Sequence, residues 1–166
     1  LQRLAYEKLA VVKVGVGTTV QDQPLETQRQ GLQIRSGIYR IIDDLGITAT
    51  PQDIEASIAP LYYRVSRLSA DAEREKFWSV LRDVHLLTAG LIADDVLKRT
   101  DDMLFYRTVP GLVHQSARFP DLATKLIRTE FEKLIGPIEK GDFQAYFCLR
   151  AETLLSFCAL LDAAES

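Results

Sequence analysis

Residues 25–46 read LETQRQGLQIRSGIYRIIDDLG, and this stretch decides the fold class. Its large aliphatic residues recur with the 3.6-residue period of a helix that buries one face, at Ile34, Ile38, Ile41, Ile42 and Leu45. Gly46 follows in the position where a glycine commonly ends a helix. The pattern predicts a long amphipathic helix that begins near Leu25 and ends before Gly46.

The chain downstream continues with helical patterns that are separated by cap and turn residues. Thr50-Pro51-Gln52-Asp53 supplies an N-cap, a proline at N1 and an acid at N3 for a second helix. A third long segment covers residues 69–92. Thr100-Asp101 and Pro110-Gly111 are weaker breaks, which we expect to divide the middle of the chain.

Two sharper signals divide the last part of the chain. Pro120-Asp121 starts a helix that runs to about Lys140. Gly141-Asp142 ends that helix and caps a last one over residues 143–164. After residue 22 no stretch is typical of a strand. We therefore predict an all-α fold, a bundle of six or seven helices over residues 23–166.

Composition restricts the class of protein further. The 166 residues carry a net charge of −3, which excludes a chain that binds polyanions over its whole surface. The uncharged stretches are far shorter than the roughly 20 apolar residues that cross a bilayer, and no signal peptide is recognisable. Cys148 and Cys158 lie in one apolar segment. They indicate buried thiols in a reducing compartment, so we expect a cytoplasmic protein.

The start of the chain has a different pattern. Residues 1–9 have helical spacing without a capping residue before them, which suggests that the natural chain continues upstream. Residues 11–14 and 18–20 are rich in β-branched side chains and flank Gly15-Val16-Gly17, as in a β-hairpin. Residues 21–26 are polar and contain a proline, as a linker does.

This helix-then-hairpin segment resembles the end of the winged helix-turn-helix in GntR-family transcriptional regulators. The resemblance rests on two features: a helix with regularly spaced leucines over residues 1–9 and the Gly-x-Gly-Thr-x-Val turn over residues 15–20. Val16 departs from it, because the family often has a basic residue there. The resemblance implies that residues 1–22 are the remnant of a DNA-binding domain that contacts DNA through Arg3, Lys13, Gly15, Gly17 and Thr18. The alternative is a Gly-x-Gly hairpin in an unrelated protein.

Residues 23–166 resemble, more weakly, the all-helical effector domain in the FadR-like branch of that family. Leu32-Gln33-Ile34-Arg35 matches its first helix, and Gly141-Asp142 matches a junction before its last helix. The resemblance implies a domain that binds a small organic effector and forms a homodimer. Effector binding would then change the placement of two DNA-binding domains.

Many members of the family bind a divalent metal in this domain through an Asp and three histidines. In this chain the matching positions lack that ligand set and hold Arg74, Trp78, Phe131 and, last, a residue near Glu152 or Thr153. We therefore expect no metal and no other cofactor. His85 and His114 lie far apart in the sequence, and we interpret them as surface or hydrogen-bonded structural histidines.

Without a metal, the effector pocket should be apolar with single polar anchors. Arg35 is the best anchor, because a guanidinium suits a carboxylate or a phosphate. The alternative is that Arg35 pairs with an acid on a neighbouring helix. The resemblance places the effector against Arg35, Tyr39, Trp78, Arg128 and Phe131. Aromatic residues at this spacing are also typical of a core, and we interpret the adjacent acids Asp101-Asp102 as structural.

These features predict a ligand-responsive, DNA-binding transcriptional regulator that acts as a homodimer. Its partners would be DNA and a small organic effector, either acyl-type or a carboxylate, and no membrane. The alternative is a helical interaction or scaffolding module that binds neither effector nor DNA. An enzyme is not expected, because the sequence lacks a P-loop, a dinucleotide-binding glycine motif and a paired cysteine motif.

Overall fold

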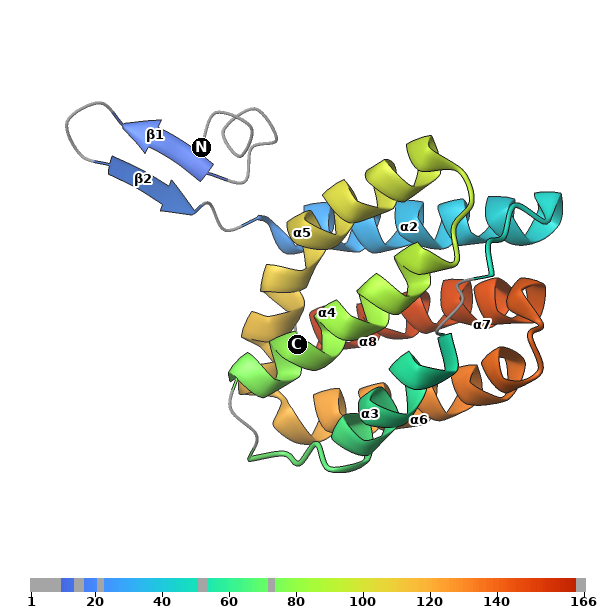
Figure 1. The fold of residues 1–166 in the computed structure, drawn as a ribbon. Helices are drawn as coiled ribbons and strands as arrows, with labels where there is room; N and C mark the ends of the chain where they lie inside the picture. The colour runs from blue at the N-terminus through green and yellow to red at the C-terminus, as the bar shows by residue number, and fades with distance from the viewer. Residues whose placement is uncertain (1–9, 14–16, 21–22, 51–53, 72–73, 164–166) are drawn as a thin grey trace.

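The computed structural model describes residues 10–13, 17–20, 23–50, 54–71 and 74–163. Strands β1 (Ala10–Lys13) and β2 (Gly17–Val20) come first, and a helical bundle follows (Figure 1). The helices of these described residues are α2 (Leu25–Leu45), α3 (Ile54–Ser66), α4 (Arg74–Gly90), α5 (Asp95–Arg118), α6 (Pro120–Glu139), α7 (Phe143–Ser156) and α8 (Cys158–Asp162). The predicted all-helical bundle is confirmed.

Helix α2 matches its prediction at both ends. Glu26 places an acid in the first turn, where the helix dipole favours negative charge. Gly46 ends the helix with a φ of 62°, a left-handed conformation that glycine adopts without steric cost. Its buried face, which includes Leu32, Tyr39 and Ile42, packs mainly against α7 and α5. α2 therefore packs along α7 and α5 with one face, while Ile34, Ile41 and Leu45, which the sequence pattern assigned to its buried face, are exposed.

The middle of the chain differs from its prediction. Helix α5 continues without a break through both expected breakpoints, Thr100-Asp101 and Pro110-Gly111. The break falls earlier, where the Asp94 side chain accepts hydrogen bonds from the backbone of Val96 and Leu97 at 2.9 and 2.8 Å. Pro110 is exposed, so water can satisfy the backbone carbonyl that loses its helical donor.

Two other expectations need correction. The predicted last helix is interrupted at Phe157, which separates α7 from α8. Cys148 is exposed and Cys158 is partly buried, so the prediction of two buried thiols is wrong. Cys148 follows the buried Phe147 on α7, and one residue turns a helix by about 100°, which carries the thiol to the solvent side. The start of the second helix at residues 51–53 lies outside the described residues.

Strands β1 and β2 pair antiparallel, with Ala10 opposite Val20 and Lys13 opposite Gly17. Figure 1 shows this pair beside the start of α2 and apart from the helical bundle. Arg3, Gly15 and the predicted helix over residues 1–9 lie outside the described residues. The two strands therefore form a two-stranded antiparallel sheet.

Candidate functional site

The centre of the bundle contains a closed set of three polar side chains from α2 and α5. Arg35 on α2 donates from Nε to Oδ1 of Asp101 on α5 at 2.7 Å. One helical turn after Arg35, the Tyr39 hydroxyl accepts from Arg35 Nη2 at 3.0 Å and donates to Asp101 Oδ2 at 2.9 Å. All three residues are buried. Each group is therefore satisfied by the other two, as burial in a low-dielectric core requires.

The electrostatics of this set favour an ionised pair beside a neutral phenol. Burial works against the charge on Asp101, but attraction to Arg35 and hydrogen bonds from His85 and Arg35 lower its pKa below the ordinary range. Burial also opposes the charge on Arg35, and the neighbouring Tyr39 and Asp101 oxygens overcome this and raise its pKa. Burial, aided by Asp101, raises the pKa of Tyr39 and keeps the phenol protonated.

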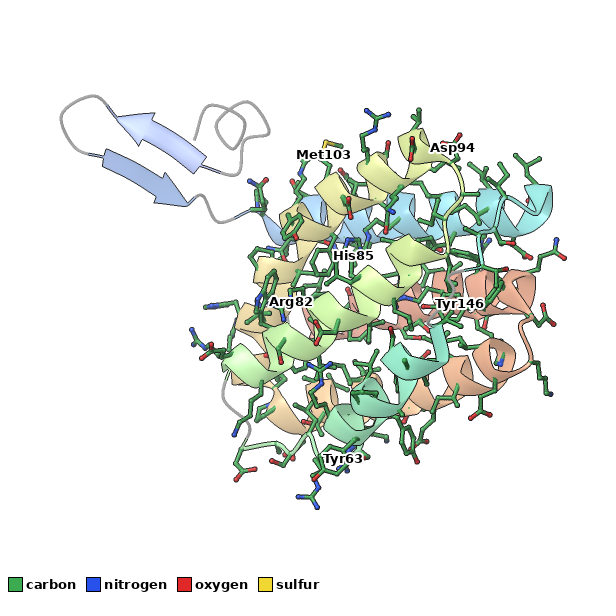
Figure 2. All side chains as sticks on the ribbon, in the orientation of Figure 1. Tyr63, Arg82, His85, Asp94, Met103 and Tyr146 are labelled. Atoms are coloured by element: carbon green, nitrogen blue, oxygen red, sulfur yellow. The ribbon has the colours of Figure 1, made fainter. Side chains whose placement is uncertain are left out.

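His85 on α4 extends this set toward the surface. Its Nε2 lies 2.7 Å from Oδ1 of Asp102, a residue whose side chain is 41% exposed. Its Nδ1 lies 3.3 Å from both Arg35 Nη2 and Asp101 Oδ2. The ring stacks on Phe105 with centroids 3.9 Å apart. As expected, His85 is a hydrogen-bonded structural histidine, and Figure 2 shows it in the interior of the bundle.

The two adjacent acids lie on different sides of α5 and contact opposite nitrogens of the His85 ring. Asp101 is buried in the core, whereas Asp102 is partly exposed. One metal ion cannot contact both carboxylates and the ring that separates them. Within the described ranges, no three His, Cys, Asp or Glu side chains gather in a way that could hold a metal ion.

A small cavity of about 20 Å³ lies between α4, α6 and α7. Its wall is mainly apolar, with contributions from Leu81, Phe131 and Phe157, and two buried charged residues, Glu130 and Arg150, also line it. Arg150 is 4% exposed, and its Nε has no hydrogen-bond partner. This volume has room for about one water molecule. The cavity therefore combines an apolar wall with a buried donor that lacks an acceptor.

Arg150 is held in place by its neighbours in the core. The buried Tyr146 hydroxyl lies 2.6 Å from Thr88 Oγ1. Burial raises the pKa of Tyr146, and the charge of Arg150 offsets part of this effect. The guanidinium carbon of Arg150 lies 5.9 Å from the centre of the Tyr39 ring, within the range of a cation–π contact. Tyr39 therefore connects the cavity to the Arg35–Asp101 pair.

The predicted effector residues do not all come together. Arg35 and Tyr39 are hydrogen-bonded to each other, and the guanidinium of Arg35 is paired with the Asp101 carboxylate. The alternative expectation, that Arg35 pairs with an acid on a neighbouring helix, therefore holds for this residue. Phe131 lines the cavity. Trp78 packs on Phe105 with centroids 5.8 Å apart. Arg128 donates to the backbone carbonyl of Ser66 at the end of α3 and is not among the residues that line the cavity.

Of the residues assigned to DNA, three lie on the paired strands. Lys13 ends β1, and Gly17 and Thr18 begin β2, with Lys13 opposite Gly17. Sequence reasoning missed Asp101 and His85 as partners of Arg35. The sequence did contain a sign of both roles. Asp101 lies one helical turn before the apolar Phe105 on α5, and His85 directly follows the apolar Val84 on α4.

No family model, curated protein or solved structure matches this chain. No helix among the described residues has both the length and the apolar character needed to cross a membrane.

Proposed function

We propose that this chain is part of a ligand-responsive, DNA-binding transcriptional regulator, similar to the FadR-like branch of the GntR family. In this proposal, residues 23–166 form the effector-binding and dimerisation domain of a cytoplasmic homodimer. The observation that carries the proposal is Arg150, which lines a mainly apolar cavity of the bundle and whose buried Nε has no hydrogen-bond partner.

An acidic effector would supply the missing acceptor. A buried donor that lacks its hydrogen bond costs on the order of 1–3 kcal/mol, and a ligand oxygen placed against it recovers that free energy. A carboxylate bonds a guanidinium more strongly than a neutral oxygen does. Since Asp101 already neutralises Arg35, Arg150 replaces Arg35 as the anchor for the carboxylate. The apolar wall suits an acyl or aromatic body on the same molecule.

The small size of the cavity gives the effector a way to act. An organic acid is larger than the water-sized space, so α4, α6 and α7 must separate when it enters. A ligand that binds the separated arrangement more tightly shifts the protein toward it. The Arg150–Tyr39 contact then transmits the change to α2, which directly follows the β-hairpin in the chain.

The hairpin supplies the DNA-facing part of the proposal. In the wing of a winged helix-turn-helix, backbone amides, hydroxyls and basic side chains contact phosphate groups. Lys13, Gly17 and Thr18 on the paired strands, together with Arg3 and Gly15, are the residues that we assign to these contacts. A shift of α2 in each protomer would change the distance between two such wings.

Thermal unfolding with a series of straight-chain and aromatic carboxylic acids tests the effector site. At least one acid should raise the Tm of the natural chain and of Arg128→Met, whose arginine lies outside the cavity lining. The same acid should leave the Tm of Arg150→Met unchanged, because the anchor is missing. An equal Tm rise in Arg150→Met would contradict the proposed anchor.

A second candidate function is the helical interaction module. An open groove of about 530 Å³ lies between α3 and α6, lined by Ile58, Ala59, Tyr62, Ile135 and Glu139. Tyr62 is 48% exposed in this groove, and exposed aromatic residues are common anchors at protein interfaces. This candidate predicts that none of the carboxylic acids changes the Tm, so the same experiment separates the two functions.

A further inference from the structure

Glu130 on α6 is a second charged residue in the wall of the Arg150 cavity, and the proposed function does not use it. It lies about one helical turn after Ile127 and one turn before Leu134, so it interrupts the apolar face of α6 that lines the cavity. Its exposed fraction is 5%, and that of Arg150 on the neighbouring helix α7 is 4% (Figure 1). Charged residues are almost never buried to this extent unless they are paired. Two buried groups of opposite charge therefore line one small cavity.

The two charged groups do not pair with each other. No hydrogen bond or ion pair joins Glu130 to Arg150 in the described part of the chain. Glu130 Oε1 accepts from Lys133 Nζ at 2.7 Å, and the Lys133 side chain is 48% exposed. Water screens an ion pair with a half-exposed lysine, so the pair is weak. A carboxylate accepts several hydrogen bonds, so Glu130 keeps acceptor capacity beside the unpartnered Nε of Arg150.

Thr153 adds a second acceptor to the same wall. It lies on α7 one turn after Arg150, and it lines the cavity. Its hydroxyl donates its proton to the Leu149 carbonyl at 2.9 Å, so the oxygen can take part in further hydrogen bonds only as an acceptor. The polar lining residues that the structure describes are thus one cationic donor and two acceptors. A simple carboxylate would satisfy only the donor and would meet the negative charge of Glu130.

We infer that the ligand of this cavity is an amino acid with an apolar side chain, whose carboxylate binds Arg150 and whose ammonium group binds Glu130. This effector class rests on the proposed function, which supplies the carboxylate anchor. The ammonium group supplies N–H donors for Glu130 and Thr153, which an acid without an amino group lacks. The apolar wall suits the side chain of the amino acid. A zwitterion also adds no net charge to the buried site, whereas an anion does.

Isothermal titration calorimetry of the whole chain with matched compounds tests this ligand class. The pairs are free leucine with isocaproate and free phenylalanine with phenylpropionate, and the members of each pair differ only by the amino group. At least one of the two amino acids should bind about tenfold more tightly than its deaminated partner, because its ammonium group gains a charge-assisted hydrogen bond. In Arg150→Met the amino acid and its deaminated partner should both lose affinity, since both use the carboxylate anchor.

Glu130→Gln and Lys133→Met form a matched pair of variants, because each breaks the same ion pair from one side. In Glu130→Gln the amino acid should bind no more tightly than its deaminated partner, since its ammonium group is buried without a counter-charge. In Lys133→Met the advantage of the amino acid should grow by about threefold, since no lysine competes for the carboxylate. Lys133 is half exposed, so folding tolerates its change. A merely structural ion pair would give the same result in both variants.

Two results would overturn the inference: amino acids that bind the natural chain no more tightly than their deaminated partners, or an advantage that Glu130→Gln leaves unchanged. In either case the carboxylate anchor of the proposed function stands if the acids bind the natural chain and not Arg150→Met. If Arg150→Met keeps full affinity for the acids while the amino group still adds a tenfold advantage that depends on Glu130, the ammonium subsite stands and the carboxylate anchor does not. The two failures are therefore distinguishable.

Discussion

The guanidinium of Arg35 and the carboxylate of Asp101 meet at 2.7 Å, and the exposed fractions of their side chains are only 2% and 0%. The two residues lie 66 positions apart in the chain, and their ion pair joins α2 to α5 in the core. A buried ion pair adds little stability relative to a well-packed apolar pair, but removing one partner leaves an isolated charge that water cannot reach. Removing one partner of the pair should therefore cost more stability than replacing both.

Asp101→Asn should lower the free energy of unfolding by about 3–5 kcal/mol, because Arg35 stays charged and buried without its counter-ion. Asp95→Asn, an exposed change on the same helix, should cost less than about 1 kcal/mol. The double change Arg35→Met with Asp101→Leu should cost less than Asp101→Asn alone. Urea unfolding measures all three, and a double variant less stable than Asp101→Asn would refute this account of the pair.

The acid sensitivity of the fold follows from the same pair. The pKa of Asp101 is lowered in the folded state, so its contribution is fully present above the unfolded pKa of about 3.9 and is lost as the pH falls below it. Between about pH 5 and pH 2 the natural chain should therefore lose stability more steeply than Asp101→Asn. Urea unfolding at a series of pH values measures the two slopes, and parallel slopes would show that the carboxylate is not linked to folding.

Two glycines on α2 should respond oppositely to alanine. At Gly37 a Cβ would meet nothing within 4 Å, so Gly37→Ala should stabilise the chain by about 0.5–1 kcal/mol through reduced freedom of the unfolded state. At Gly31 a Cβ would collide with the Thr108 methyl group, so Gly31→Ala should destabilise it by about 1–3 kcal/mol. Thermal unfolding compares the pair, and equal Tm changes would show that the helix contact is looser than described.

The Thr88–Tyr146 hydrogen bond in the core should contribute to stability. Thr88→Val keeps the shape of the side chain but removes the oxygen that lies 2.6 Å from the buried Tyr146 hydroxyl. The change should lower the free energy of unfolding by about 1–2 kcal/mol. Thr100→Val, at a half-buried hydroxyl that bonds only its own helix backbone, should cost less. Urea unfolding measures the free energy of unfolding of both variants. A smaller loss for Thr88→Val than for Thr100→Val would show that the Thr88–Tyr146 hydrogen bond does not stabilise the fold.

Local features were predictable because their causes are local. The end of α2 at Gly46, the start of α6 at Pro120 and the Asp142 cap of α7 each depend on a residue type within one turn of the boundary. Thr100-Asp101 misled the prediction because an aspartate is both a common turn residue and a possible buried ion-pair partner. Only the contact with Arg35, on another helix, decides between these roles.

The candidate site was predictable only in part. Arg35 stood out as a charge on an apolar helix face, but whether it meets a ligand or an acid depends on packing that no local pattern contains. Arg150 is important for its unsatisfied Nε, which is a property of the three-dimensional structure. Sequence periodicity predicted the buried face of α2 only in part, since Ile34, Ile41 and Leu45 are exposed, and it cannot identify which buried donor lacks an acceptor.

Native mass spectrometry of the chain purified without added ligand shows whether Arg150 holds an acidic effector. We expect a dimer that carries a small organic acid, retained in Arg128→Met and lost in Arg150→Met. A chain that carries no small molecule, or an Arg150→Met variant that keeps the same bound mass, would contradict it.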